Sequence, residues 1–223
     1  MSRLIAIGDI HGMADPLRKL IDKIIPTSQD NIVCLGDYIN RGPDSKGVLD
    51  TLLELDKTCK VNFILGNHEE YLLAATTSRD AFRQWLKFGG DVALRSWGIT
   101  PPFTAMSPFD YRQLPADHLR LLAALQQFHE TDGHIFVHAG LLARIPMHQQ
   151  SSEDLRWRTP VEGLRHCSGK IVVCGHSPHP YAVRVGGLWH VDTGAGVRRD
   201  GKLSAVDVLT GKIWMVDAGI PVG

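Results

Sequence analysis

Five short apolar runs of this sequence each lead to a glycine and to a side chain that can bind a metal ion. The side chains that follow these runs belong to Asp9 and His11, Asp37, Asn67, His138 and His176. Such runs predict buried β-strands, and ligands of open α/β sheets gather at the carboxyl ends of strands. We therefore expect the five strand ends to converge on one site.

Each of these residues also has a structural explanation when it is taken alone. Asp9 could cap the helix that follows it, and Asp37 could be an ordinary turn residue. A single His138 or His176 is more often a hydrogen-bonded core histidine than a ligand. Five such strand ends in one chain favour a common site over five independent structural roles.

The ligand types indicate which chemistry the site would carry. Carboxylate, amide and imidazole ligands without thiolate suit Mn²⁺ first, with Fe or Zn²⁺ as alternatives, better than copper or iron–sulfur chemistry. A carboxylate can bridge two such ions about 3.5–4 Å apart, and a water between them becomes a hydroxide near neutral pH. The prediction is a site for two divalent metal ions, whose hydroxide attacks phosphorus directly and in line without a covalent phosphoenzyme.

The order of the motifs resembles a known family. Gly8–Gly12 reads GDIHG, Gly36–Gly42 reads GDYINRG and Gly66–Glu69 reads GNHE, followed by His138-Ala139 and Gly175-His176. This pattern is similar to that of the PPP-type metallophosphoesterases, in particular the bacterial and phage serine/threonine protein phosphatases that are like the lambda phosphatase. The resemblance runs on through Val191–Ala195 and weakens between residues 78 and 127.

The resemblance implies a role for each matching residue. One ion would be bound by Asp9, His11 and Asp37, and the second by Asp37, Asn67, His138 and His176. Arg41 would bind phosphate, because the planar fork of arginine matches phosphate oxygens. The family has a second arginine after a tryptophan, for which we choose Arg158 over Arg156, although the usual spacing is Trp-x-Arg.

His68 is the candidate general acid, because it follows Asn67 and would point toward the leaving group. The resembled phosphatases place an aspartate beside this histidine, whereas this chain has Asn40. Asparagine can accept a hydrogen bond from the ring but supplies no negative charge to favour imidazolium. Poor leaving groups such as phosphoserine should therefore be affected more than aryl phosphates.

Composition limits the other functions and the cellular setting. The 223 residues carry 24 Lys+Arg and 24 Asp+Glu, so the net charge is zero and no basic stripe predicts nucleic-acid or membrane binding. The four cysteines show no CxxC spacing and are interpreted as buried thiols. With no signal peptide or membrane-spanning run expected, we predict a cytoplasmic protein. No oligomeric state is predicted.

The expected fold is α/β, a calcineurin-like sandwich of two mixed β-sheets packed face to face with helices outside. Residues 1–223 should form a single domain, with helices over 13–25, 44–55, 69–75, 79–88, 91–97 and 114–127. Gly186-Gly187 and Thr210-Gly211 predict hairpins in a largely antiparallel second half. The segment at about 78–127 is either an insertion over the site or plain helical packing on the sheet.

Three functions follow from this pattern. The first is a phosphomonoester hydrolase, a serine/threonine protein phosphatase acting on phosphorylated protein, peptide or small phosphoester substrates. The alternative is symmetric hydrolysis of a dinucleoside polyphosphate such as diadenosine tetraphosphate, since those enzymes also lack aspartate at the position of Asn40. A pseudo-phosphatase that binds without turnover is the third.

Glu69-Glu70 is interpreted as the acidic first turn of a helix, and the five tryptophans as core residues.

Overall fold

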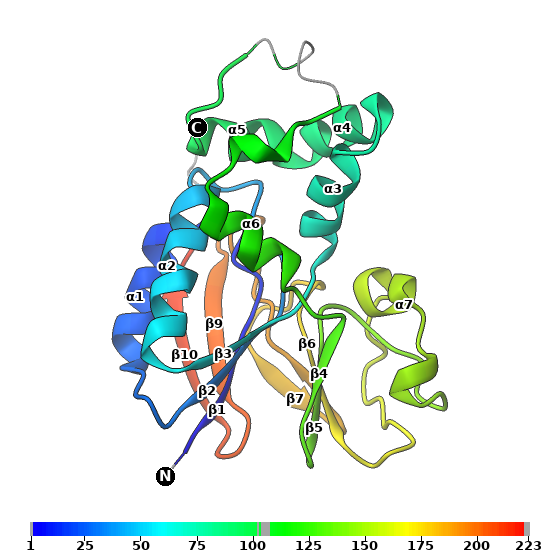
Figure 1. Cartoon of the computed structure of the whole chain (residues 1–223). Helices are drawn as coiled ribbons and strands as arrows, with labels where there is room; N and C mark the ends of the chain where they lie inside the picture. Colours follow the sequence, from blue (N-terminus) through cyan, green and yellow to red (C-terminus); the bar gives the residue numbers. More distant parts are fainter. Residues whose placement is uncertain (1, 102, 104–107, 221–223) are drawn as a thin grey trace.

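The computed structural model describes residues 2–101, 103 and 108–220, which form two β-sheets and the helices around them (Figure 1). The α-helices are α1 (Ala14–Ile24), α2 (Ser45–Thr58), α3 (Asn67–Ala75), α4 (Arg79–Trp85), α5 (Asp91–Ser96), α6 (Ala116–Ala123) and α7 (Ser152–Trp157). The strands are β1 (Leu4–Ile7), β2 (Asn31–Cys34), β3 (Lys60–Phe63), β4 (Phe128–Glu130), β5 (His134–Val137), β6 (Ile171–Cys174), β7 (Val183–Val185), β8 (Leu188–His190), β9 (Lys202–Asp207) and β10 (Lys212–Asp217).

The first sheet has the strand order β10-β9-β1-β2-β3. Its strands β1, β2 and β3 are parallel, with Ile5 opposite Ile32 and Ile32 opposite Val61. The helices α1 and α2 form the crossovers between them, as the repeated order of strand, loop and helix predicts. Parallel pairing brings the loops after these three strands to one edge of the sheet.

The second sheet has the order β4-β5-β6-β8-β7, and β5, β6 and β8 are parallel. The two predicted hairpins are present as β7–β8 and β9–β10. The expectation of a largely antiparallel second half holds for the pairs β4–β5, β7–β8, β9–β10 and β1–β9. The pairs β5–β6 and β6–β8 are parallel instead, because long connections carry the chain between these strands in the same direction. The ends of β5 and β6 therefore lie at one edge, where His138 and His176 follow.

The two sheets pack face to face, as expected for the calcineurin-like sandwich. Alternation along β1 sends Ala6 toward the second sheet and Ile5 toward the outer helices. The core between the sheets includes Val33 from β2, Phe136 from β5 and Val173 from β6, all with no exposed surface. Leucines of α1 and α2 cover the outer face of the first sheet. Leu155 of α7 packs on the outer face of the second.

Helices α3 to α6 lie at the end of the molecule where the parallel strands finish (Figure 1). The predicted break after α4 occurs at Phe88 and Gly89, where Gly89 has φ 93°. The helix expected over 114–127 is shorter, because Pro115 precedes α6 and Gln126 pairs with Ile64 as an isolated β-bridge. β4 and α7 were not expected from the sequence.

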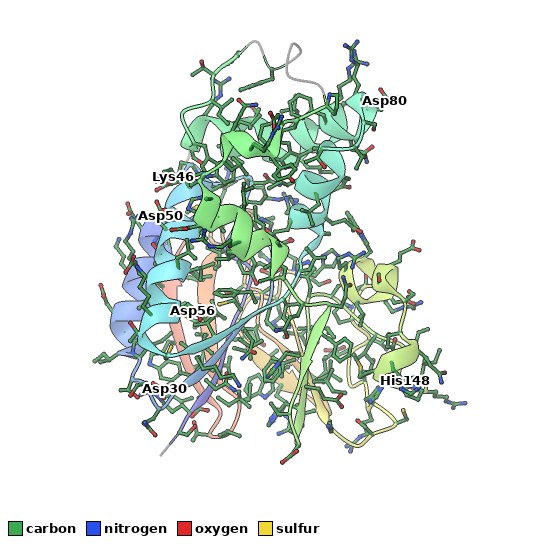
Figure 2. All side chains as sticks on the ribbon, viewed as in Figure 1. Asp30, Lys46, Asp50, Asp56, Asp80 and His148 are labelled. Carbon is green, nitrogen blue, oxygen red and sulfur yellow. The ribbon has the colours of Figure 1, made fainter. Side chains whose placement is uncertain are left out.

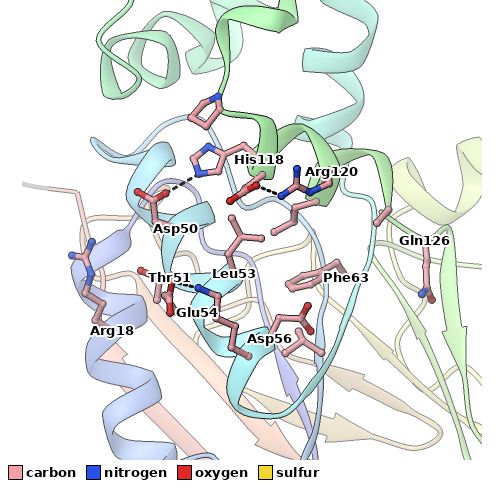
Figure 3. Close-up of a pocket in the computed structure, with 16 residues that line it drawn as sticks. Arg18, Asp50, Thr51, Leu53, Glu54, Asp56, Phe63, His118, Arg120 and Gln126 are labelled. Carbon is pink, nitrogen blue, oxygen red and sulfur yellow. Dashed lines mark hydrogen bonds and ion pairs between the residues drawn. The ribbon is translucent and has the colours of Figure 1, made fainter.

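A hollow of about 870 Å³ lies between α2, β3 and α6 (Figure 3). At its edge the buried His118 accepts a hydrogen bond from Trp97 Nε1 at its Nδ1, over 2.9 Å. Because the indole N–H is only a donor, His118 Nε2 carries the proton and donates to Asp50 at 2.8 Å. This chain of hydrogen bonds fastens α6 to α2. None of the candidate metal ligands lines the hollow.

Asp30 fastens the turn between α1 and β2, at the end of the first sheet far from α4 and α5 (Figure 2). Its carboxylate accepts from Arg3 Nε at 2.9 Å and from the Thr27 backbone N–H at 2.7 Å. The hydrogen bond from Arg3 holds the pKa of Asp30 well below its ordinary value. We expect Asp30→Asn to lower the free energy of unfolding by about 2 kcal/mol at neutral pH.

The same contacts give this effect a pH dependence with a definite sign. Because the pKa of Asp30 is lower in the folded state, its contribution is complete above the unfolded pKa of about 3.8 and is lost as pH falls toward the folded value. Urea unfolding of the natural and Asp30→Asn proteins should give stabilities that converge between about pH 5 and about pH 2. A gap that stays constant over this range would rule out the ion pair as its cause.

Candidate active site

The loops after β1 and β2 are bound to each other through their backbones. The backbone N–H groups of Ile10 and His11 donate to Asp37 O at 3.0 and 2.8 Å, and that of Gly12 donates to Tyr38 O at 2.8 Å. Five non-glycine residues of the candidate site have φ between 47° and 72°, namely His11, Asp37, Asn40, Arg41 and His176. Residues other than glycine rarely adopt this backbone conformation, because it costs about 1 kcal/mol or more per residue. Such strained residues concentrate at functional sites. Backbone strain is thus gathered where the sequence predicts chemistry.

Asp37 lies between two groups of possible ligands. Its Oδ2 is 3.6 Å from His11 Nε2, and its Oδ1 is 3.4 Å from His138 Nε2. Ligand atoms of Asp37, His11 and His68 lie within 4.8 Å of one another, and so do those of Asp37, His138 and His176. Burial raises the pKa of Asp37 to about 7. One carboxylate therefore faces both groups, as the prediction of a shared ligand requires.

The second group contains Asn67, His138 and His176. His138 Nδ1 lies 2.9 Å from Leu35 O, which can only accept, so Nδ1 carries the proton and Nε2 has a free lone pair. His138 Nε2 lies 2.9 Å from Asn67 Oδ1 and 3.2 Å from His176 Nδ1. Burial lowers the pKa of both histidines to about 4. Neutral imidazoles and an amide oxygen that converge in this way fit a divalent cation.

The loop after β1 carries both Asp9 and His11, but only His11 belongs to the group with Asp37 and His68, and the predicted ligand Asp9 is in neither group. Asp9 is buried, and its two carboxylate oxygens accept from the His176 backbone N–H at 3.1 and 3.0 Å. Burial raises the pKa of Asp9 and lowers that of His11. His11 Nδ1 is buried without a hydrogen-bond partner among the residues that the structure describes. Buried carboxylates beside an imidazole with an unused nitrogen fit a bound cation, which would offset the cost of burying these charges.

Glu69 has a structural role in the candidate site that the sequence interpretation missed. It stands in the first turn of α3, as expected, but it has no exposed surface. Its Oε2 accepts from the backbone N–H of Asp37 at 2.9 Å and of Gly66 at 3.2 Å. Its Oε1 accepts from Tyr38 N at 2.8 Å and Ile39 N at 3.2 Å. Glu69 thus holds in place the loop that carries Asp37. The only sequence feature that could have indicated this role is the glutamate at the end of the GNHE motif.

Asn40 contacts His68 directly, as the sequence interpretation expects. Its Nδ2 lies 2.9 Å from His68 Nδ1, and its Oδ1 accepts from Trp85 Nε1 at 3.1 Å. Because the indole N–H is only a donor, Trp85 fixes the amide so that its NH₂ faces the ring. The expected direction of this bond, with asparagine accepting from His68, is therefore reversed. His68 Nδ1 is an acceptor here.

The three arginines lie in different settings. Arg41 lies beside His68, and its Nε–H is directed at His68 Nε2 over 3.4 Å. Arg158 pairs with Asp154 at 2.6 Å, and 40% of its side chain is exposed. Arg156 is buried and pairs with Glu70 at 2.6 Å. No hydrogen bond or ion pair within the described ranges joins Arg156 or Arg158 to the candidate ligands, so a phosphate-binding role for Arg158 stays a prediction.

Asp192, at the end of β8, is a second buried acid whose role was not predicted. Its Oδ1 accepts from Gly194 N at 2.8 Å, and burial raises its pKa to about 7. The negative charge of Asp192 also contributes to the raised pKa of Asp9. Its position after a parallel strand, within Val191–Ala195, is the signal that could have identified it.

Comparison with known proteins identifies the family. The sequence profile of the calcineurin-like phosphoesterases matches residues 2–208. The chain belongs to the calcineurin-like phosphoesterase family. Membership confirms the predicted fold and the predicted class of enzyme, a phosphoester hydrolase that depends on divalent metal ions.

Two curated relatives carry different names. The chain is 30% identical to the symmetrical bis(5'-nucleosyl)-tetraphosphatase of Nitrosomonas europaea, an alignment that covers 86% of this chain and 66% of that protein. It is also 30% identical to serine/threonine-protein phosphatase 1 of Salmonella typhimurium, over 85% of each chain. Further symmetrical tetraphosphatases, from Acidovorax and Cellvibrio japonicus, align over 48% and 25% of their lengths. The chain thus spans two thirds or less of the tetraphosphatases it matches.

Solved structures agree with the fold. A structure described as a candidate diadenosine tetraphosphatase superposes with a TM-score of 0.69 at 22% identity, covering 98% of this chain and 95% of that one. A cold-active protein-tyrosine phosphatase from Shewanella gives a TM-score of 0.69 at 16% identity, over 96% and 80%. Within the described residues, no helix combines the length and the apolar character needed to cross a membrane.

Proposed function

We propose that this chain hydrolyses dinucleoside polyphosphates such as diadenosine tetraphosphate, cleaving a phosphoanhydride bond symmetrically with the help of divalent metal ions. The observation that carries this proposal is the orientation of Asn40 between Trp85 and His68. The similarity to the Nitrosomonas europaea protein, which is named a symmetrical bis(5'-nucleosyl)-tetraphosphatase, supports it. The proposal favours the second of the functions expected from the sequence over the first.

The orientation of Asn40 decides which leaving groups the site can release. Asn40 and Arg41 direct N–H groups at His68 Nδ1 and Nε2, over 2.9 and 3.4 Å, but a neutral imidazole has a single lone pair and can accept only one of them. The shorter contact, from Asn40, leaves the proton of neutral His68 on Nε2, and among the described residues no carboxylate hydrogen-bonds to its ring to favour imidazolium. Burial, together with the positive charge of Arg41, lowers the pKa of His68 to about 3. His68 can therefore donate a hydrogen bond to a leaving oxygen but gives up a proton poorly.

Leaving groups differ widely in their need for that proton. A serine alkoxide is about as basic as hydroxide, whose conjugate acid has a pKa of about 16, so it must be protonated as it departs. A nucleoside diphosphate leaves through a phosphate oxygen whose pKa is about 6 and needs no proton at neutral pH. The phosphoanhydride is thus the substrate best matched to Asn40.

The other residues of the site have consistent roles. The residues that would hold the two ions are Asp9, His11, Asp37, Asn67, His138 and His176. When bound, the ions supply an activated water and positive charge for in-line attack on phosphorus. Arg41, four positions after Asp37 and beside His68, would bind the non-bridging phosphate oxygens. Glu69 keeps the Asp37 loop in place through four backbone hydrogen bonds.

Phosphoserine hydrolysis is the second candidate, and one observation favours it. The alignment with the Salmonella typhimurium protein phosphatase covers 85% of that enzyme, against 66% for the Nitrosomonas europaea tetraphosphatase. A panel of diadenosine tetraphosphate, p-nitrophenyl phosphate and a phosphoserine peptide, assayed with Mn²⁺, separates the two. We expect kcat/KM for the dinucleotide to exceed that for the peptide by about 100-fold or more. Faster hydrolysis of the peptide would overturn the proposal, and bound metal without any turnover would indicate a pseudo-phosphatase.

Asn40→Asp tests the role of this position. The carboxylate would accept from His68 Nδ1–H and favour imidazolium, at the cost of the amide NH₂ that now faces the ring. We expect turnover of the phosphoserine peptide to rise by about 10-fold, and that of p-nitrophenyl phosphate to change by less than about 3-fold. The two rates are measured on the same preparation, with Asn62→Asp, on β3, as the control for an added carboxylate. Equal changes on both substrates would refute a leaving-group role for Asn40.

A further inference from the structure

Three aromatic side chains from separate elements meet beside the candidate active site. Tyr71 of α3 stacks on Phe88, in the turn after α4, with ring centroids 4.6 Å apart and an interplanar angle of 11°. Trp157, at the end of α7, meets Tyr71 edge-on at 5.3 Å and 80°. We call these three residues the aromatic corner. Phe88 and Trp157 keep 38% and 37% of their surface exposed, so the expectation that Trp157 belongs to the core is wrong.

The aromatic corner borders the candidate ligands on two sides. The ring of Tyr71 lies 6.3 Å from that of His68, and the ring of Trp157 lies 6.2 Å from that of His176. The turn that carries Phe88 is also packed on the loop that carries Arg41, since a Cβ on Gly89 would lie 2.5 Å from Arg41 N. A phosphate held by Arg41 and His68 would thus lie next to exposed aromatic surface.

The corner is held in place before any ligand binds. Trp157 Nε1 donates to Glu70 Oε2 at 2.7 Å, and the other oxygen of Glu70 accepts from Arg156 at 2.6 Å. A shallow hollow of about 400 Å³ adjoins the exposed side of Trp157, lined also by Glu70, Glu153 and Arg156. Aromatic surface fixed in this way loses little entropy when a flat ligand stacks on it.

We propose that the aromatic corner binds one base of the dinucleotide, and that Phe88 is a specificity-determining residue. This inference rests on the proposed function, because a base enters the site only with a nucleotide substrate. Every nucleobase presents a flat π-face, and stacking on an aromatic side chain tolerates changes of base. The corner should therefore favour nucleotides over phosphate compounds without a base, with little preference between adenine and guanine.

Phe88→Leu tests the inference with little risk to folding, because Phe88 is partly exposed. We expect KM for diadenosine tetraphosphate to rise by about 10-fold, while KM for inorganic tripolyphosphate changes by less than about 2-fold. Phe88→Tyr keeps a ring that can stack and should restore most of the selectivity. Tyr111→Leu is the matched control, because Tyr111 is an exposed aromatic residue outside the corner. An equal rise in both KM values, or none, would overturn the role of Phe88.

A binding measurement separates this inference from the proposed function. Calorimetry with Mn²⁺ present should show ADP binding about 10-fold more weakly to Phe88→Leu than to the natural protein, with inorganic pyrophosphate nearly unaffected. If the natural protein fails to cleave the dinucleotide, the proposed function is wrong, but weaker ADP binding still supports the corner. Equal ADP affinity in both proteins refutes it, whatever the activity shows.

Discussion

Asp37→Asn is expected to lower kcat/KM by about 1,000-fold or more on every phosphoester substrate. Its two carboxylate oxygens face His11 on one side and His138 on the other, so a single residue serves both groups of candidate ligands. The amide has almost the same shape and can still accept from His68 N, which now donates to Asp37 Oδ1 at 3.0 Å. What the substitution removes is the charge and the second oxygen that would bridge two ions.

Elemental analysis and activity assays measure the two consequences together. The natural protein should bind two Mn²⁺ per chain, and Asp37→Asn fewer than two. Asp207→Asn is the matched control, because Asp207 is equally buried but its hydrogen bonds go to Leu4, Leu209 and Thr210. Two ions in Asp37→Asn with more than a tenth of natural activity would show that Asp37 is not the shared ligand.

Glu69→Gln should cause the second largest loss. Four backbone N–H groups converge on the two carboxylate oxygens of Glu69. Glutamine offers one oxygen and turns an NH₂ toward two of these buried donors. Each buried donor left without an acceptor costs about 1–3 kcal/mol, so the free energy of unfolding should fall by about 3 kcal/mol.

Activity should fall with it, by about 100-fold, because the Asp37 loop loses the contacts that fix its positive-φ conformation. Urea unfolding, and kcat/KM for inorganic tripolyphosphate, which has no base to reach the aromatic corner, are compared with Glu70→Gln, the neighbouring acid on the same turn. Among the described residues, the Glu70 carboxylate accepts hydrogen bonds only from Arg156 and Trp157. Glu70→Gln should therefore lower the free energy of unfolding by about 1 kcal/mol. Equal losses in the two variants would mean that Glu69 is merely a helix residue.

The strand ends could be predicted from the sequence because apolar runs and glycines are local signals. Asp9, His11, Asp37, His138 and His176 each follow such a run, and parallel pairing in both sheets brings their loops together. The same local signals predicted the two hairpins and the break at Gly89. The parallel pairing of β5, β6 and β8 was not predicted, because the connections that decide it have no regular pattern.

Other features depend on contacts between distant residues and leave no local signal. The amide orientation of Asn40 is fixed by Trp85 of α4, which is 45 positions away in the sequence. Glu69 looks like any acid in a first helical turn until its four donors are seen. The aromatic corner combines Tyr71 with residues from two other elements, one of which, α7, was not expected at all. These are the features on which substrate choice depends in our proposal.

The most direct test of the central claim is the identity of the products formed from diadenosine tetraphosphate in ¹⁸O-labelled water. The proposed function predicts two molecules of ADP for each dinucleotide, with a single ¹⁸O on one of them, because water attacks an inner phosphorus directly. Cleavage to ATP and AMP would contradict symmetric attack. Absence of cleavage, alongside rapid hydrolysis of a phosphoserine peptide, would contradict the assignment of Asn40 to a site for phosphoanhydrides.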